Sequence, residues 1–474
     1  MKHLSLYVML VFLCGACTTR PGADRGQNAF HSQIIFPYQK EHVHGSTLVQ
    51  LPGGDVLAAW FQGSGERWAD DVRIMGARLS KGDTAWSAPF LMADTRGFPD
   101  INPILFMDKR DRLWLMWYPV LANQWETSIP MYRISEDYRG KGAPVWSWQD
   151  VLFVKAGDKT ERGIQPDDSF VKQVAAQLNE YESYLHETLL PALPDTMRPL
   201  MEEGWRRYKV KMDSLSKGKN MVRSGRVREG DKEVSAQLGY PLSRRIGWQT
   251  KNKAVFSGNR MIVPLYSDGF DCTLFALTDD GGENWIFSNP VLGGAGIQAT
   301  IGIEHDSTLV AYLRDNGPPP NRMQRTESHD HGLTWSIPKD DILPNPGAGF
   351  DMVTLPDGEW LIVFNDLEEG RYDLSVAISD DEGKSWRWKR TIEHDDRKEN
   401  RTSSHYPSVI AGRDGLIHLV YSFHRSDTNP GKTIKYATFP ADWVRDSAKI
   451  AGVSADVRSS RASDADLLAW VAAK

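Results

Sequence analysis

One eight-residue pattern decides the fold of this chain, and it occurs in Thr278-Asp-Asp-Gly-Gly-Glu-Asn-Trp285, Ser328-His-Asp-His-Gly-Leu-Thr-Trp335 and Ser379-Asp-Asp-Glu-Gly-Lys-Ser-Trp386. Each copy places Asp two positions after Ser or Thr, Gly two positions later, and Trp at the end. The Asp carboxylate can accept hydrogen bonds from backbone N–H groups in a turn. Gly permits the tight backbone, and Trp packs against a neighbouring sheet. The three Trp residues are 50 and 51 positions apart, which indicates a repeated hairpin unit. Degenerate copies end at Trp86 and Trp146.

Paired apolar runs alternate with these turns along the chain. The six pairs are 47–61, 103–118, 254–266, 299–313, 352–365 and 408–423. Each pair changes direction around Gly, Pro, Asp or Asn, as β-hairpins do. We therefore predict an all-β fold, a six-bladed β-propeller over residues 32–440. A strand at 33–38 is expected to close the ring beside the strand at 433–439.

A different periodicity interrupts the third-blade region at about 161–236, where apolar residues recur at helical spacing. We predict a helical insertion there. It either packs on one blade or forms a lid or rim of a substrate cleft. The chain ends in a tail, 441–474, for which we predict a short helix at 463–474.

The first residues have the features of an export signal. Lys2 precedes a short apolar run, and small residues precede Cys17. We predict a signal peptide at 1–16, lipidation of Cys17 and a lipidated tether at 17–31, with an ordinary secretory signal cut nearby as the alternative. The protein is then an exported lipoprotein in the periplasm or at the surface of a bacterium, and it meets the membrane only through its lipid anchor. Cys272, in an alternating run, is expected to be a buried structural thiol.

The composition excludes several classes of protein. The 474 residues carry a net charge of −6, which gives no basic field for nucleic acid. Three Cys residues are too few for a disulfide scaffold. The sequence has no Cys/His metal spacing and no phosphate-binding loop, so we expect no metal and no cofactor. We expect a monomer.

Propeller geometry brings equivalent strand positions to one face of the ring. The predicted starts of the innermost strands carry His44, Asn102, Lys253, Gln298, Asp351 and Tyr406. The predicted ends of the second strands and the loops after them carry Glu66, Arg67, Asp70, Asp71, Tyr118, Asp268, Arg314, Asn365, Arg371, His424 and Arg425. This mixed-charge set is typical of a pocket for an anionic sugar. The Trp turns lie at the opposite face and belong to the scaffold.

The Asp boxes and six hairpins resemble the sialidase (neuraminidase) superfamily, in particular its Asp-box (BNR-repeat) bacterial sialidase-like branch. The resemblance covers about 32–440 apart from the insertion, and it includes His44-Gly-Ser-Thr, Asn102-Pro-Ile-Leu-Phe and Tyr406-Pro-Ser. It implies that Arg314 and Arg371 bind a substrate carboxylate, that Asp70 or Asp71 is the general acid/base, and that Tyr406 is the nucleophile. Arg67, Gln298 and Asn102 are further candidates for substrate binding.

Two positions depart from the sialidase pattern. His44 stands where the first arginine of the triad is expected, and Gln298 stands where a Glu would activate the tyrosine. Gln cannot take a proton, so Tyr406 is expected to stay neutral. His44 is a further candidate catalytic residue. Structural roles for the two arginines, Tyr406 and His44 in contacts between blades are the alternative.

These observations predict an exo-glycosidase that removes a terminal acidic sugar from a glycan. A polysaccharide lyase is the alternative, in which an arginine neutralises a uronate carboxylate while His44 or Tyr406 moves protons. A third possibility is a propeller that binds glycans without catalysis.

Overall fold

The computed structural model describes residues 30–157, 168–217, 227–229, 232–234, 245–317, 320–426 and 430–446. The predicted signal peptide, Cys17, nearly all of the tether and the predicted C-terminal helix fall outside these residues. No helix in the described ranges is both long and apolar enough to cross a membrane.

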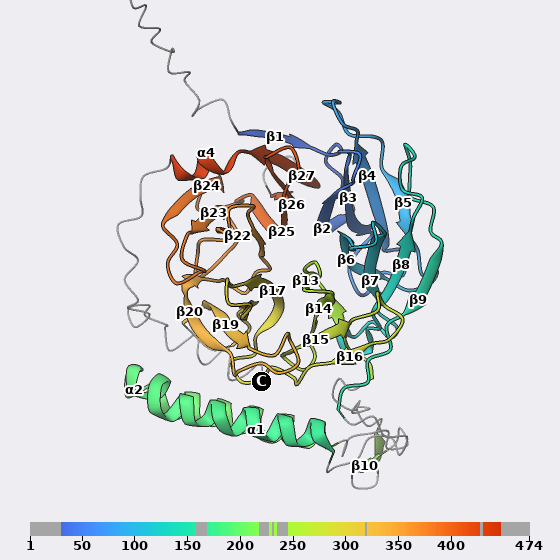
Figure 1. The fold of residues 1–474 in the computed structure, drawn as a ribbon. Helices are drawn as coiled ribbons and strands as arrows, with labels where there is room; N and C mark the ends of the chain where they lie inside the picture. The colour runs from blue at the N-terminus through green and yellow to red at the C-terminus, as the bar shows by residue number, and fades with distance from the viewer. Residues whose placement is uncertain are drawn as a thin grey trace, which may run out of the picture.

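Six antiparallel sheets form a ring in the described part of the chain, so the predicted six-bladed propeller is confirmed (Figure 1). The first two blades are β2 (His42–Gln50), β3 (Val56–Gly63), β4 (Arg73–Leu79) and β5 (Phe90–Ala93), then β6 (Asp100–Met107), β7 (Leu113–Pro119), β8 (Met131–Ser135) and β9 (Trp148–Val151). The third is β12 (Gln249–Thr250), β13 (Val255–Ser257), β14 (Arg260–Ser267), β15 (Cys272–Thr278) and β16 (Ile286–Phe287).

The fourth and fifth blades are β17 (Ile297–Ile303), β18 (Leu309–Arg314), β19 (Arg322–Ser328) and β20 (Lys339–Pro344), then β21 (Asp351–Thr354), β22 (Trp360–Phe364), β23 (Asp373–Ser379) and β24 (Trp388–His394). The sixth combines β25 (Ser403–Ala411), β26 (Ile417–Arg425) and β27 (Gly431–Phe439) with β1 (His31–Ile34). β1 pairs with β27 from His31–Thr438 to Ile34–Lys435, which closes the ring as the sequence predicted. The helix α4 (Ala441–Arg445) follows.

The Asp boxes adopt the predicted turn. In the β19–β20 copy, the Asp330 carboxylate accepts the Ser328 hydroxyl at 2.9 Å and the Thr334 N–H at 2.8 Å. Gly332 has φ +87°, which suits the turn because glycine lacks a Cβ. Trp335 stacks on Phe275 of the preceding blade with ring centroids 4.0 Å apart. Each box therefore ties two blades together.

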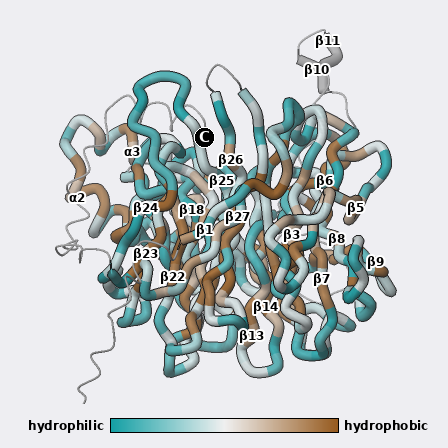
Figure 2. Tube along the Cα trace, turned by 90° about the horizontal axis from the view of Figure 1, so that it is seen from above, coloured by the Kyte–Doolittle hydropathy of each residue, from teal (hydrophilic) through white to brown (hydrophobic). Residues whose placement is uncertain are grey.

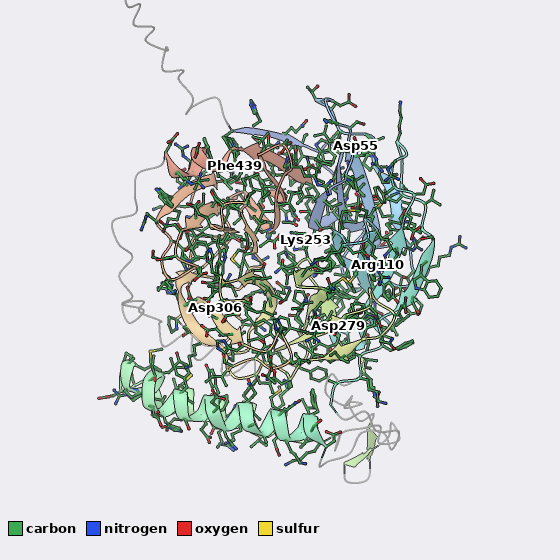
Figure 3. All side chains as sticks on the ribbon, viewed as in Figure 1. Asp55, Arg110, Lys253, Asp279, Asp306 and Phe439 are labelled. Atoms are coloured by element: carbon green, nitrogen blue, oxygen red, sulfur yellow. The ribbon has the colours of Figure 1, made fainter. Side chains whose placement is uncertain are left out.

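Apolar residues fill the space between blades, whereas the loops at both ends of the ring are hydrophilic (Figure 2). The buried thiol of Cys272 lies in β15, as expected. Lys253 lies near the axis of the ring, and Asp55, Asp279 and Asp306 lie farther out (Figure 3). Lys253 forms an ion pair with Asp351 at the start of the fifth blade's inner strand.

The insertion contains α1 (Ser169–Tyr184), the π-helical turn η2 (Leu185–Leu189), α2 (Leu190–Ala192) and α3 (Arg198–Ser216), and the short strands β10 (Val227–Glu229) and β11 (Lys232–Val234). α1 and α2 lie outside the ring (Figure 1). Tyr181 and Trp205, with ring centroids 5.0 Å apart, join α1 to α3, and both pack in one core cluster with Leu292 and Ile337 of the propeller. Gln177 donates to the Trp335 carbonyl at 2.9 Å, which anchors α1 to an Asp-box turn.

Candidate functional site

The same backbone irregularity occurs near the start of four innermost strands. β2, β6, β17 and β25 each shift register there, and the residues inside the shifts with positive φ are Gly45, Asn102, Gln298 and Tyr406 at +63°, +44°, +55° and +46°. Positive φ is unfavourable for a side chain as bulky as tyrosine and is found where the fold enforces it. Such bulges redirect side chains.

The register also fixes which face these bulges occupy. Ile297 at the start of β17 pairs with Arg314 at the end of β18, whereas Leu309 at the start of β18 pairs with Ser328 of the Asp box. Arg314 and the bulge therefore share one face, and the Asp box lies at the other, as predicted.

A cavity of about 550 Å³ opens on the bulge face. Its lining residues are His42, His44, Glu66, Arg67, Trp125, Asp268, Arg314, Arg371, His405, Tyr406, His424 and Lys432. Of the candidate catalytic and substrate-binding residues, the cavity therefore brings together His44, Arg67, Arg314, Arg371 and Tyr406.

Two side chains hold the Tyr406 hydroxyl. Arg314 Nη1 donates to it at 3.0 Å, and Gln298 Nε2 donates to it at 3.1 Å. Arg314 Nη1 also donates to Gln298 Oε1 at 3.3 Å, which fixes the orientation of the amide. The His44 ring lies against Tyr406 with centroids 4.3 Å apart. Gln298 is thus behind the cavity, in contact with a residue that lines it.

Within the described residues, the arginines of the cavity form no ion pair with a carboxylate. Among the ion pairs of the described residues, none involves Arg67, Arg314 or Arg371. The Nε atoms of Arg67 and Arg314 are buried without a hydrogen-bond partner. Burial lowers the pKa of Arg314, but the nearby Tyr406 and Asp268 outweigh it, so the net shift of the pKa is upward. Among the described residues Arg314 donates only through Nη1, so its Nη2 is left as an N–H donor for an anion in the cavity.

Arg67 and Arg371 are held by other contacts. The Arg67 guanidinium lies 3.7 Å from the Trp68 ring and 4.9 Å from the Trp125 ring. Arg371 donates to the Gly347 carbonyl at 2.8 Å and to His405 Nδ1 at 2.9 Å. Burial lowers the pKa of Arg371.

Four histidines cluster on one side of the cavity: His42, His44, His405 and His424. Lys432 donates to His42 Nδ1 at 2.8 Å, and His424 Nε2 donates to the Val43 carbonyl at 2.9 Å. Burial is the main cause that lowers all four pKa values, to about 3 for His42, about 4 for His424 and well below 6.5 for the other two. The rings are therefore neutral at neutral pH. No group of His, Cys, Asp or Glu in the described ranges is arranged to hold a metal ion.

The carboxyl groups that face the cavity are Glu66 and Asp268, and not the two that the sequence favoured. Burial raises the pKa of Glu66. Asp70 and Asp71 are exposed outside the cavity lining, and Asp71 accepts the Ser64 hydroxyl at 2.8 Å, a bond that lowers the pKa of Asp71.

Asn102 lies behind the cavity and does not line it. Its Nδ2 donates to the hydroxyls of Tyr118 and Tyr266 at 3.2 and 3.1 Å. Lys251, which the sequence interpretation missed, is buried with its Nζ 5.2 Å from the Tyr406 ring, and burial lowers its pKa to about 7. Lys251 donates to Asn252 Oδ1 at 2.9 Å. These residues support the site from below.

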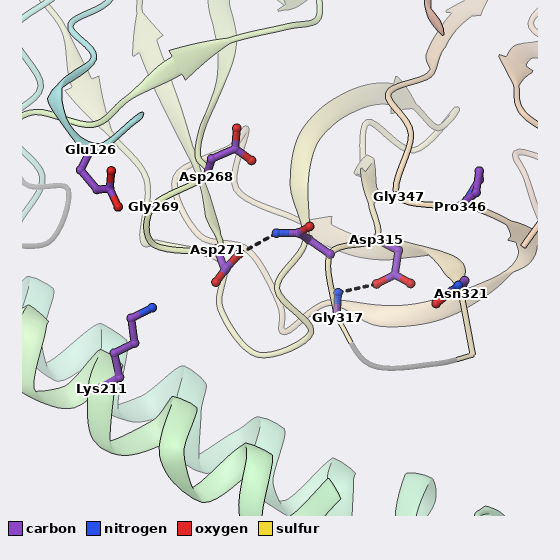
Figure 4. Close-up of a pocket in the computed structure, with 11 residues that line it drawn as sticks. Glu126, Lys211, Asp268, Gly269, Asp271, Asp315, Gly317, Asn321, Pro346 and Gly347 are labelled. Atoms are coloured by element: carbon purple, nitrogen blue, oxygen red, sulfur yellow. Dashed lines mark hydrogen bonds between the residues drawn. The ribbon is translucent and has the colours of Figure 1, made fainter. Parts of the chain in front are cut away.

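A second cavity of about 480 Å³ adjoins the first and shares Asp268 with it (Figure 4). Asp271, Asp315 and Glu126 make it acidic, and Lys211 of α3 lines its other side. Asp315 accepts the Gly317 N–H at 2.8 Å. The insertion therefore packs on the propeller and also contributes one side chain beside the candidate site.

The chain matches the family model of the BNR repeat-like domain over residues 54–162 and 225–419. It belongs to this family, and the resemblance to the sialidase and BNR-repeat superfamily is confirmed.

Among curated proteins, an anhydrosialidase from Macrobdella decora is 35% identical over 82 residues, which are 17% of this chain and 10% of that protein. The match thus spans about a tenth of that relative's length. The structure of a protein of unknown function from Dyadobacter fermentans DSM 18053 has a TM-score of 0.55 at 12% identity and covers 87% of this chain and 100% of that one. The intramolecular trans-sialidase from Ruminococcus gnavus has a TM-score of 0.51 at 16% identity over 89% of this chain and 99% of that one. These structures share the fold.

Proposed function

We propose that this protein is an exo-acting glycoside hydrolase that binds a terminal acidic sugar of a glycan. One observation carries the proposal: Arg67, Arg314 and Arg371 line a single cavity without a carboxylate partner among the described residues. A guanidinium group binds a carboxylate through two parallel N–H···O hydrogen bonds. A partly buried guanidinium group is poorly hydrated until an anion binds to it. The sialidase names among the relatives support the same substrate class.

Glu66 is our candidate for the acid. Its pKa is raised by burial, so its carboxyl group retains a proton nearer to neutral pH than an exposed Glu does. In hydrolysis the glycosidic C–O bond breaks and the leaving oxygen takes the proton of Glu66. Water then adds to the anomeric carbon and gives one proton back to the Glu66 carboxylate. This role replaces the one that the sequence favoured for Asp70 or Asp71.

A polysaccharide lyase is the second candidate, because Tyr406 contacts the neutral His44 and makes no hydrogen bond to a carboxylate among the described residues. An arginine would neutralise the uronate carboxylate while His44 removes the proton beside it. The electron pair then forms a C=C bond, the C–O bond on the next carbon breaks, and the leaving oxygen is protonated.

A panel of purified glycans tests both reactions. The panel contains sialosides, uronate-capped and rhamnose-capped glycans, together with matched glycans that lack the carboxylate. We expect new reducing ends from a carboxylate-capped glycan without ultraviolet absorbance. An unsaturated, absorbing product assigns the lyase, binding without turnover assigns a binding module, and equal use of the neutral glycans contradicts carboxylate recognition.

We also propose export and lipid anchoring through Cys17, on the sequence features of residues 1–17. Cys17→Ser removes the thiol that would carry lipid. The variant is expected in the soluble fraction and the parent in the membrane fraction. Equal fractionation of the two proteins contradicts the anchor.

A further inference from the structure

The hydrogen bonds of Tyr406 fix the direction of its hydroxyl proton. Arg314 Nη1 and Gln298 Nε2 can only donate, so the phenol oxygen accepts both bonds, at 3.0 and 3.1 Å. The amide of Gln298 cannot be reversed without loss, because its Oε1 accepts from Arg314 at 3.3 Å. Both acceptor positions of the hydroxyl are therefore occupied by the protein.

The proton of the hydroxyl has no acceptor among the residues that the structure describes. These two bonds are the only hydrogen bonds of the Tyr406 hydroxyl within the described residues, and Tyr406 lines the cavity. The ring is held by His44 at 4.3 Å and by a backbone with φ +46°, so it cannot turn away easily. The O–H bond is left to point toward whatever occupies the cavity.

Arg314 presents an adjacent unused donor. Its Nη1 is committed to Tyr406 and Gln298, whereas its Nη2 makes no hydrogen bond within the described residues. The Arg314 guanidinium and the Tyr406 hydroxyl are 3.0 Å apart, close enough for the two oxygens of one carboxylate to accept from both.

We propose that Tyr406 is a hydrogen-bond donor to the substrate carboxylate, in a clamp with Arg314, and is not the nucleophile of the reaction. The inference rests on the proposed function, since it needs an acidic sugar in the cavity. A nucleophilic tyrosine needs a neighbouring base that takes its proton. In this chain the neighbour at that place, Gln298, donates a hydrogen bond to the oxygen instead.

The variant Gln298→Glu distinguishes the two roles of Tyr406, because a nucleophile predicts higher turnover and a carboxylate clamp predicts weaker binding. If Tyr406 were a nucleophile lacking its base, a carboxylate at 298 would supply the base and raise turnover. In the clamp, a carboxylate at 298 draws the Tyr406 proton inward and competes with the substrate for Arg314. Gln298→Glu is therefore expected to weaken binding of an acidic sugar.

The experiment titrates the full-length protein with N-acetylneuraminate and with glucuronate by calorimetry. Tyr406→Phe is expected to weaken binding of the preferred acid about ten- to a hundredfold, the loss of one hydrogen bond to a charged group. Gln298→Glu is expected to weaken it at least as much. Tyr312→Phe is the matched control, because its buried hydroxyl donates to the Gly383 carbonyl of an Asp box, outside the cavity lining. Its affinity should equal that of the parent.

Two results overturn the clamp while leaving the proposed function intact: parental affinity in Tyr406→Phe with the fold unchanged, or higher turnover in Gln298→Glu. A mass increase on Tyr406 after incubation with a fluorinated sugar acid that traps glycosyl-enzymes also overturns it. Failure of the parent to bind either acid contradicts the clamp and the proposed function together.

Discussion

The two faces of the propeller differ in what is repeated from blade to blade. On the Asp-box face, three turns repeat one pattern of residues. The carboxylates of Asp280, Asp330 and Asp381 each accept from the hydroxyl two positions earlier and from the N–H four positions later, at 2.8–3.0 Å. On the cavity face, four bulges repeat one backbone shape but carry Gly45, Asn102, Gln298 and Tyr406. Repetition of side chains therefore marks the scaffold, and repetition of backbone alone marks the candidate site.

The polar groups of the two faces also differ in how completely their hydrogen bonds are satisfied. The Asp-box carboxylates are saturated by N–H and O–H donors. On the cavity face, the buried Nε atoms of Arg67 and Arg314 have no hydrogen-bond partner among the described residues, and burial raises the pKa of Glu66. Buried polar groups without a hydrogen-bond partner reduce stability, and they are found at sites where a bound ligand supplies the missing partner. Substitutions on the cavity face should alter chemistry, and substitutions at the Asp boxes should alter stability.

The largest effect is expected at Glu66. Glu66→Gln removes the proposed acid and should lower kcat about 10²- to 10⁴-fold on the glycan found active in the panel. Asp70→Asn and Asp71→Asn are matched controls from the same loop, and both should stay within about twofold of the parent because these side chains lie outside the cavity lining. A severe loss in either control would restore the assignment made from the sequence.

Arg314→Lys is expected to have the next largest effect. Lys keeps the charge but cannot reproduce the fork of N–H donors or hold Tyr406. The specificity constant kcat/KM should fall roughly ten- to a hundredfold, about 1.5–3 kcal/mol. Arg325→Lys serves as the control, because Arg325 pairs with Glu304 and Glu327 away from the cavity lining. Equal rates in the two variants would contradict carboxylate binding by Arg314.

The fold was predictable because its determinants are local. Turn chemistry repeats every fifty residues or so, and alternation within each hairpin fixes which residues face the core. Closure by β1 could also be predicted, since an unpaired edge beside β27 needs a partner. Boundaries were less certain: the closing strand was expected at 33–38 and lies at His31–Ile34.

The site was predictable only in part. Ring geometry brought together His44, Arg314, Arg371 and Tyr406, because equivalent strand ends must share a face. Choosing Glu66 over Asp70 required the path of a loop, which depends on a contact from another blade, Asn123 to the Arg67 carbonyl at 2.7 Å. No local pattern encodes such a contact.

Two supporting residues were missed for a simpler reason. The first hairpin was predicted to begin at residue 47, whereas β2 begins at His42, so His42 fell outside the expected strand. Lys251 follows the short strand β12, which has no alternation long enough to detect.

Asp330→Ala tests the scaffold face. It removes the acceptor of the Ser328 hydroxyl, the Thr334 N–H and the Thr334 hydroxyl. The free energy of unfolding should fall by about 1–2 kcal/mol, measured by denaturant titration, because the turn loses bonds that only partly transfer to water. The kcat of the variant below its melting temperature should be unchanged. A selective loss of kcat without a loss of stability would break the distinction between the two faces.

The smallest effect is expected from Lys251, whose charge is buried beneath Tyr406. Its pKa in the folded protein is lowered to about 7, so above pH 7 the unfolded chain binds more protons at this site than the folded one. The free energy of unfolding of the parent should therefore rise with pH from about 7 upward, by roughly 1 kcal/mol between pH 7 and 8. Lys251→Met lacks the titrating group that causes this pH dependence. Its free energy of unfolding should exceed that of the parent, most of all below pH 7, and the difference should shrink as the pH rises. The histidines of the cavity contribute little above about pH 7.5, because they are neutral in the folded protein and their ordinary pKa of 6.5 makes them mostly neutral in the unfolded chain as well. Their remaining contribution is common to the parent and the variant. Parallel stability curves for the two proteins between pH 7 and 9 would show that Lys251 keeps its proton in the fold, and the site would then hold one more cation than its geometry suggests.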